Sequence, residues 1–292
     1  DSIELAYMGN SGHHLQNRYD FNQCPVTSSD LTCNRALRPY TRYSSLLRAD
    51  FNGNSSYNAF VAKYQHRLSG GVNLRAEYAF AKALTDSFES GGATNGHITS
   101  RRDLDKDLAS FDTRHRMITS LIWELPFGRG RKYGAAMSRA LDMAVGGWTL
   151  STISTFQTGT PIIMSSANTT GSPFVTHRPN RLGDGKLDDI DIRSNPLYLD
   201  PAAWANPAQG HFGNSSRNPL LGPGLNNWDI GIQKFFSIRE ATKLQFRMEM
   251  FNAFNHAQFN HPNANTGSGA NFGLVGGARP PRLIQFGLKL VF

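Results

Sequence analysis

The last stretch of the chain alternates between apolar and polar residues, and this pattern constrains the fold more than any other feature. Five apolar side chains share one parity there: Ile284, Phe286, Leu288, Leu290 and Phe292. Alternate side chains of a strand lie on opposite faces, so one face is continuously apolar. A strand that crosses the outer membrane needs about 9–11 such residues, often with an aromatic residue at its rim. The stretch meets both requirements, although a soluble sheet could use it as an edge strand.

Seven further segments show related alternation, so the sequence predicts about eight strands. They cover residues 3–7, 58–67, 72–80, 114–125, 148–156, 228–238, 243–254 and 282–292. The pair Gly70-Gly71 predicts a tight turn and Arg239-Glu240 a short one, and residues 134–144 predict a short helix. Residues 43–51 are compatible with a short hairpin arm. The blurred period of residues 58–67 indicates a possible β-bulge.

The connections between these strands alternate in length. Long polar connections are expected at residues 10–54, 85–112, 160–225 and 255–281, whereas the others are short or medium. Outer-membrane barrels sort their connections in this way, with short turns inside and long loops outside. The sequence therefore predicts an all-β, antiparallel transmembrane β-barrel segment over residues 1–292, with those four stretches as outer loops.

Composition narrows the alternatives. The chain has no run of 18 apolar residues, which excludes a membrane-spanning helix. The net charge is +8, but the basic residues are scattered, and only Arg101-Arg102 and residues 129–132 cluster. The sequence shows neither a recognition helix nor a surface of basic and aromatic residues beside them, so we expect no nucleic-acid partner.

The two cysteines, Cys24 and Cys33, lie in a polar loop. A disulfide between them is the preferred interpretation and would indicate an extracytoplasmic compartment, with two free thiols as the alternative. No metal-ligand spacing flanks the pair. Four aspartates in the long central loop could hold calcium, but their spacing does not match the calcium-loop pattern: Asp184, Asp188, Asp189 and Asp191.

No catalytic motif appears in a suitable setting, so we expect no enzymatic activity, no cofactor and no bound metal. Three strand glutamates lie near arginines, where ion-paired structural roles in a barrel lumen are expected: Glu77, Glu124 and Glu249. Six aromatic residues near strand ends predict interfacial girdles: Trp123, Trp148, Phe156, Trp228, Phe254 and Phe292.

Several short motifs carry a resemblance to a known family. They include residues 7–15, 112–116, 125–130, 212–218, 227–229, 244–249, 251–256 and 281–289. In combination they resemble the carboxy-terminal barrel segment of TonB-dependent outer-membrane receptors, in the Oar-like group abundant in acidobacteria. The resemblance implies a 22-stranded barrel with an amino-terminal plug, of which this sequence would hold the last eight strands. It begins Asp1-Ser2, so a fragment or a processed chain is expected.

The resemblance also implies function and partners. A receptor of this kind admits a bulky substrate, such as a glycan or a metal complex, through energy-coupled movement of its plug. Its partners would be outer-membrane lipid and lipopolysaccharide, the amino-terminal strands and plug that the sequence lacks, and the TonB system.

Two other classes of protein remain open at this point. One is a self-closed eight-stranded barrel with a structural or adhesive role, in which the first and last strands pair with each other. The other is a secreted soluble sandwich, which would need no detergent.

Overall fold

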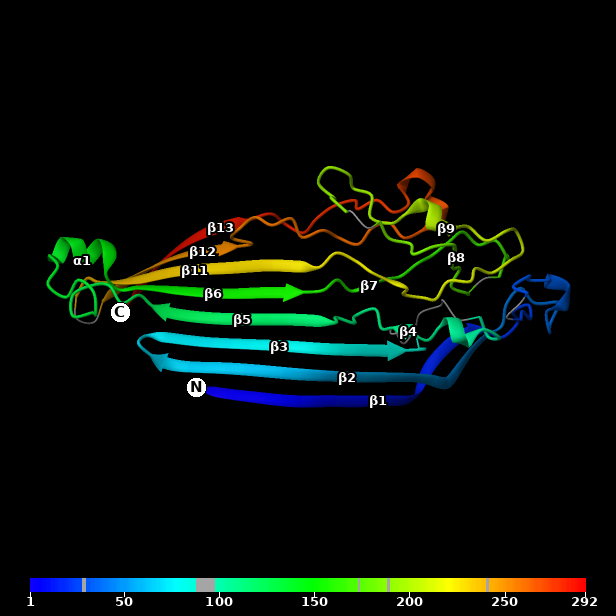
Figure 1. Ribbon diagram of the computed structural model, residues 1–292, viewed down its shortest axis with the longest axis horizontal. Helices are drawn as coiled ribbons and strands as arrows, with labels where there is room; N and C mark the ends of the chain where they lie inside the picture. The colour runs from blue at the N-terminus through cyan, green and yellow to red at the C-terminus, as the bar shows by residue number, and fades with distance from the viewer. Residues whose placement is uncertain (28–29, 88–97, 173, 188–189, 240–241) are drawn as a thin grey trace.

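The protein folds around one antiparallel sheet. The structure, a computed structural model, describes residues 1–27, 30–87, 98–172, 174–187, 190–239 and 242–292. Eight long strands neighbour one another in chain order, and the short strand β4 (Asp107–Leu108) joins beside β3 (Figure 1). The long strands are β1 (Ser2–Asp20), β2 (Leu47–Ser69), β3 (Val72–Thr85), β5 (His115–Glu124), β6 (Trp148–Gln157), β11 (Leu225–Ser237), β12 (Lys243–Phe251) and β13 (Leu283–Val291).

The strand register gathers apolar side chains on one face of the sheet. For example, Trp123 of β5 lies opposite Leu150 of β6, and the same row continues across the next three strands. In that row Ile232 pairs with Met248, which in turn pairs with Phe286. Because side chains alternate along every strand, this register produces one continuous apolar face. We call it the outward face, since it has the character of a lipid-facing barrel wall.

The opposite face is mostly polar and carries ion pairs. The Lys63 Nζ lies 3.2 Å from a Glu4 carboxylate oxygen, and Lys63 stands opposite Glu77 in the next strand. Farther along, the Arg247 guanidinium lies 3.0 Å from the Glu249 carboxylate. Both pairs are partly exposed, so each contributes only about 0–1 kcal/mol. Their charges suit a hydrated lumen better than hydrocarbon.

Short turns and long loops lie at opposite ends of the sheet, as the sequence predicts (Figure 1). The β2–β3 turn is Gly70-Gly71, whose φ angles of 67° and 81° are easily adopted by glycine. The β5–β6 connection at the same end contains helix α1 (Arg139–Val145), which starts five residues later and ends one residue later than the stretch predicted at 134–144. Both chain termini also lie at this end.

The sheet has two open edges. In the described part of the chain, β1 pairs only with β2, and β13 pairs only with β12. The self-closed eight-stranded barrel requires β1 and β13 to pair, and the structure does not show that pairing. The eight strands therefore form a curved wall with its first and last strands unpaired on one side.

The loop expected at residues 10–54 is shorter than the sequence indicates. Strand β1 continues to Asp20, where it pairs with Leu47 at the start of β2, so the loop covers residues 21–46. A break in register near His14, whose φ is 56°, bends the two strands without ending them. Bulges increase local bending, and the sequence pattern is lost at such a break. The predicted hairpin arm at residues 43–51 partly coincides with this start of β2.

The long central connection also departs from the expected irregular loop. It contains four two-residue strands: β7 (Pro161–Ile162), β8 (Asn180–Arg181), β9 (Trp204–Ala205) and β10 (Leu220–Leu221). Strand β12 ends at Phe251, three residues before the expected end, because an Asn252 with φ of 48° turns the chain. The expected turn at Arg239-Glu240 falls partly outside the described residues.

Aromatic side chains cluster toward both ends of the outward face. At the loop end, the Trp228 ring lies edge-on to Phe156 and Phe254, with ring centroids 5.5 and 5.7 Å apart. At the turn end, Trp148 stands edge-on to Phe246 at 6.0 Å. This distribution fits the predicted girdles, which stay a prediction. None of the helices in the described part of the chain has the length and apolar character that a membrane crossing requires.

Candidate functional site

The four long loops pack against one another at one end of the sheet. We call this assembly the outer cap and define it as the described residues of 21–46, 86–114, 158–224 and 252–282. Two hydrophobic clusters of buried side chains occur within it. Segments distant in sequence therefore meet in the cap, although each looks like an irregular loop when taken alone.

The first cluster joins the third and fourth loops. Met164 and Leu199 are fully buried there, and Phe272 packs against them from the last loop. The Tyr198 hydroxyl donates a hydrogen bond to the Leu221 carbonyl at 2.9 Å. Burial raises the pKa of Tyr198 to about 12, because the charged phenolate is disfavoured there.

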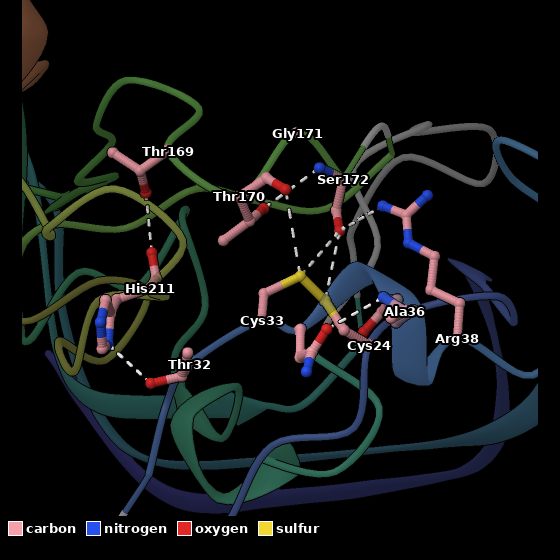
Figure 2. Close-up of a disulfide and its surroundings, with 12 residues drawn as sticks. Cys24, Thr32, Cys33, Ala36, Arg38, Thr169, Thr170, Gly171, Ser172 and His211 are labelled. Atoms are coloured by element: carbon pink, nitrogen blue, oxygen red, sulfur yellow. Dashed lines mark hydrogen bonds between the residues drawn. A yellow bond between two sulfur atoms is a disulfide. The ribbon is translucent and has the colours of Figure 1, made fainter. Parts of the chain in front are cut away.

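The second cluster contains the disulfide and joins the first three loops. Cys24 and Cys33 are bonded, with Cα atoms 5.2 Å apart, and pack with Ile98, Val175 and Phe212. Figure 2 shows the disulfide beside residues 169–172 of the third loop.

Polar contacts fix the disulfide loop in place. The Ser172 hydroxyl lies 3.8 Å from Cys24 Sγ and 3.7 Å from Cys33 Sγ, and it accepts a hydrogen bond from Arg38 at 3.2 Å (Figure 2). The Cys33 amide donates to the Gly210 carbonyl at 2.5 Å. The disulfide thus closes a small loop and also docks that loop against the third one.

A buried ion pair links the second and third loops. The Arg178 guanidinium contacts the Asp105 carboxylate, with only 1% and 0% of the two side chains exposed. Arg178 also donates to the Leu104 carbonyl at 2.7 Å. Burial raises the pKa of Asp105, and the adjacent Arg178 charge offsets part of that effect. Buried pairs tolerate the loss of one partner poorly, because the other charge is left without compensation.

Further contacts seat the cap on the wall. The Asn218 amide hydrogen-bonds to Asp107 at 2.8 Å, beside the end of β3. Arg102 donates to the Asn52 carbonyl of β2 at 3.1 Å and lies 3.0 Å from the Asp86 carboxylate. At Gly53 a Cβ atom would approach the Leu15 carbonyl to 2.9 Å, so the two bent strands come close only because this residue is glycine.

A hollow of about 550 Å³ lies below the cap, where β1 and β2 bend. Tyr57 and Phe111 contribute aromatic rings, and hydroxyl and amide groups complete the lining. Its full lining is Asn10, Leu15, Gln16, Ser55, Ser56, Tyr57, Ala83, Leu84, Thr85, Ser87, Ala109 and Phe111. These residues carry no charge. Such a surface offers stacking and hydrogen bonds to a polar, uncharged ligand.

Two more hollows follow on the polar face toward the turn end. One of about 290 Å³ shares Tyr57, Ala83 and Phe111 with the first hollow and also contacts Glu77. The next, of about 400 Å³, shares Glu77 and is lined by the Glu4–Lys63 pair. The three hollows form a row along the polar face from the cap to the turns. The hollow nearest the cap is therefore lined by uncharged residues, and the hollow nearest the turns is lined in part by charged ones.

Several of the acidic residues singled out in the sequence take part in ion pairs and turns. Glu249 and Glu124 each pair with an arginine, Glu124 with Arg131 at 3.2 Å. Asp191 accepts a hydrogen bond from the Ser194 hydroxyl at 2.8 Å, so it caps a turn. Asp188 and Asp189 lie outside the described residues. No group of three or more His, Cys, Asp or Glu side chains suited to a metal ion occurs within the ranges that the structure describes.

Sequence reasoning missed the buried pair Arg178–Asp105 and the hollow beneath the cap. Arg178 lies in a segment without strand or helix periodicity, and it is 73 residues away from Asp105 in the sequence. A short-range pattern carries no information on such a contact. Two residues that line the hollow, Tyr57 and Ala83, lie just outside the strands predicted at residues 58–67 and 72–80, so longer strand predictions would have included them.

A comparison with known protein families agrees with this architecture. A family model described as an outer membrane beta barrel domain matches residues 2–285. Among curated protein sequences, none matches the chain. Two solved structures are similar in fold: the ferric citrate transporter FecA in its unliganded form, and the outer membrane transporter YddB from Escherichia coli.

These likenesses are distant and partial. FecA is 14% identical with a TM-score of 0.38, over 82% of this chain and 24% of FecA. YddB is 10% identical with a TM-score of 0.46, over 99% of this chain and 30% of YddB. The chain thus spans less than a third of either transporter. The family match covers nearly all of its residues: the chain belongs to the outer membrane beta barrel domain family, located in the bacterial outer membrane.

Proposed function

We propose that this chain forms part of the barrel wall and outer cap of a TonB-dependent outer-membrane receptor that takes up a bulky substrate. One observation carries the proposal: the eight-stranded wall has an apolar outward face, yet within the described residues β1 pairs with β2 alone and β13 pairs with β12 alone. An open edge is unfavourable in a membrane, where backbone groups find no water. Additional strands that pair with β1 and β13 would remove both edges.

The resemblance to TonB-dependent receptors implies the partners that would complete this barrel. In a closed barrel, the strands that pair with β1 and β13 would complete the lumen, and a plug would fill it. Energy coupling through TonB would act on that plug, not on the residues described above. The resemblance noted in the sequence supports the Oar-like type for this receptor. We assign no catalytic step to the chain.

The uncharged hollow favours a glycan over a charged metal complex as the substrate. Tyr57 and the exposed ring of Phe111 can stack on sugar rings, while Asn10 and Gln16 offer amide hydrogen bonds. An anionic complex would meet no cationic side chain among the residues that line this hollow. The charged groups lie deeper, beside Glu77.

Binding to the complete receptor tests the substrate class. Neutral oligosaccharides and anionic ferric complexes serve as the two probe sets. Replacing Tyr57 and Phe111 together with alanine should weaken oligosaccharide binding about tenfold, as the loss of two stacking rings implies. Tyr43→Ala, which removes an exposed cap aromatic outside the hollow, should leave it unchanged. Preferential binding of the ferric complexes, insensitive to the double substitution, would contradict the assignment.

Refolding into detergent tests the place of the chain in a larger barrel. The 292-residue chain alone should aggregate and give no heat-modifiable band, whereas the receptor with its additional strands should give one. A compact, heat-modifiable band from the chain alone would favour the self-closed barrel. A soluble monomer without detergent would contradict both membrane interpretations.

A further inference from the structure

The β5–β6 connection differs from the other connections at the turn end. The β2–β3 turn has two residues, whereas residues 126–147, which we call the interfacial turn, form a folded unit with helix α1. The Ser138 hydroxyl caps the start of α1, and the Asp142 carboxylate accepts a hydrogen bond from the Arg129 amide at 2.7 Å. The rings of Phe127 and Tyr133 pack with centroids 5.7 Å apart. The turn is therefore held in one defined shape.

Two side chains of the outward face fasten the interfacial turn to the wall. Lys234 of β11 donates from Nζ to the Asp142 carbonyl at 3.1 Å and to the Met143 carbonyl at 2.6 Å. Trp148 of β6 donates from its indole nitrogen to the Ala144 carbonyl at 2.8 Å. Lys234 and Trp148 are register partners on the outward face, and Lys234 is only 4% exposed. A cation on an apolar face thus satisfies the terminal carbonyls of α1.

The helix so placed leaves apolar side chains in the open. Leu141 and Val145, one turn apart on α1, are 50% and 43% exposed, and Met143 is 57% exposed. Phe127 adds a partly exposed ring. These side chains continue the apolar surface of the wall beyond its turn-end rim, because α1 is attached to that same face. Exposed apolar groups adjoining a lipid-facing surface indicate contact with lipid.

The same turn is strongly basic. It holds four basic residues, Arg129, Arg131, Lys132 and Arg139, against one acidic residue, Asp142, whose carboxylate is engaged within the turn. Arg131 pairs with Glu124 at 3.2 Å, but the other three cations form no ion pair with described residues. All four are exposed. Lys132 lies 5.4 Å from the centre of the Tyr133 ring.

We propose that the interfacial turn lies in the headgroup region of the periplasmic leaflet and binds anionic phospholipid there. The short-turn end of an outer-membrane barrel faces the periplasm. Apolar side chains beside a cluster of free cations match the surface of an anionic leaflet, in which acyl chains lie below phosphate groups. Lys234 and Trp148 hold the turn at the required height. The proposal depends on the barrel location and not on the substrate.

Lipid retention by the complete receptor, purified from outer membranes and passed through mixed micelles, tests the proposal. The micelles contain phosphatidylethanolamine and phosphatidylglycerol in known ratio, and mass spectrometry measures the lipid that stays bound. We expect phosphatidylglycerol to be enriched, and Arg129→Gln, Lys132→Gln and Arg139→Gln together to reduce that enrichment at least about fivefold. Raising the salt concentration from 0.05 to 0.5 M should reduce it as well, since phosphate contacts are screened.

A charge-matched control separates local recognition from net charge. Arg42→Gln, Arg193→Gln and Arg279→Gln remove three exposed cations from the outer cap, at the opposite end of the wall. This control should keep the wild-type enrichment. Equal loss in both triple variants, or wild-type enrichment in the turn variant, would overturn the proposal.

A spin label reports the depth of the turn independently of lipid identity. The label is placed at Met143→Cys, with Arg193→Cys in the cap as the control, in nanodiscs of the same two lipids. At position 143 dissolved oxygen should relax the label more than a water-soluble nickel chelate does, and at position 193 the order should reverse. A label at position 143 that behaves like the one at 193 would contradict the proposal.

Discussion

The wall and the outer cap solve the problem of burying apolar side chains in opposite ways. On the outward face of the wall, Leu5 is 65% exposed and Phe286 is 69% exposed. In the cap, Met164 and Leu199 are fully buried although no regular pattern precedes them in the sequence. The outward face of the wall therefore leaves its apolar side chains for membrane lipid to cover. The cap carries its own core.

This difference means that the two regions should respond separately to mutation. All variants are made in the complete receptor, and wall integrity is measured by its heat-modifiable migration, because a closed barrel stays folded in detergent until it is heated. Cap integrity is measured by the rate at which a protease cuts the loops of the folded protein, which reports local opening. A substitution that affects one measurement and leaves the other unchanged supports the division; one that affects both shows coupling.

The largest effect is expected from the buried pair in the cap. Arg178→Met removes the guanidinium that contacts the buried Asp105 carboxylate, so the cap should lose about 3–5 kcal/mol of stability. Loop proteolysis should accelerate strongly, while heat-modifiable migration persists. Arg193→Met, which removes an exposed cap arginine, should change the stability by less than about 0.5 kcal/mol. Loss of migration in Arg178→Met would show that the wall needs an intact cap.

The disulfide should rank next. Cys24→Ser with Cys33→Ser opens a loop with a sequence separation of 9 and should cost the cap about 2–4 kcal/mol. Protease cleavage should increase first between residues 21 and 46. Because the hydrogen bond from Arg38 to the Ser172 hydroxyl does not involve the cysteines, the third loop should remain protected. If the double substitution left the cleavage rate unchanged, the surrounding contacts alone would hold the loop in place.

The wall was accessible from the sequence because its contacts follow a simple period. Alternation placed Ile284 and Phe286 on one face, and their register partners Met250 and Met248 fell on the same face. Strand pairing between chain neighbours then follows from the short turn at Gly70-Gly71. The bend at His14 escaped prediction, since the bulge interrupts the alternation that identifies a strand.

The contacts within the cap could not be predicted from the sequence in the same way. Its key contacts join residues far apart, such as Arg178 with Asp105 and Cys33 with Ser172. No local pattern records which loop meets which, so the sequence shows only polar, proline-rich connections. The cysteine pair was the one cap feature with a local signal, because two cysteines in one loop suggest a bond.

A smaller loss of stability than for the cap substitutions is expected when a glycine is replaced in a turn of the wall, and almost none when a glycine is replaced in a wall strand. Gly71 has a φ of 81°, and a Cβ there would lie 3.1 Å from the Glu124 carbonyl, so Gly71→Ala should cost about 1 kcal/mol. Gly287 of β13 lies in ordinary strand conformation with a distance of 4.0 Å to its neighbour Arg247. Gly287→Ala should be neutral. Heat-modifiable migration at graded temperatures should separate the two variants, while loop proteolysis stays constant in both.

The smallest effect is a pH dependence confined to the cap. His177 stacks on Phe212 and donates from Nε2 to the Ser172 carbonyl at 3.1 Å. Burial lowers the pKa of His177 below its usual 6.5, and burial also lowers the pKa of His261. The unfolded cap therefore takes up protons first as the pH falls through 6.5, and the folded cap does so only at lower pH. Cap stability should be constant above that range and decrease below it.

Loop proteolysis at pH 7.5 and pH 5.5 measures this decrease, with heat-modifiable migration unchanged between the two. His177→Gln preserves a hydrogen-bond donor but cannot titrate, so it should weaken the pH dependence, and adding His261→Gln should remove most of the remainder. His13→Gln, on a wall strand, should leave the pH dependence of the cap intact. If that control flattened the response, the titrating group would belong to the wall, and the cap would not be the independent unit that its buried core indicates.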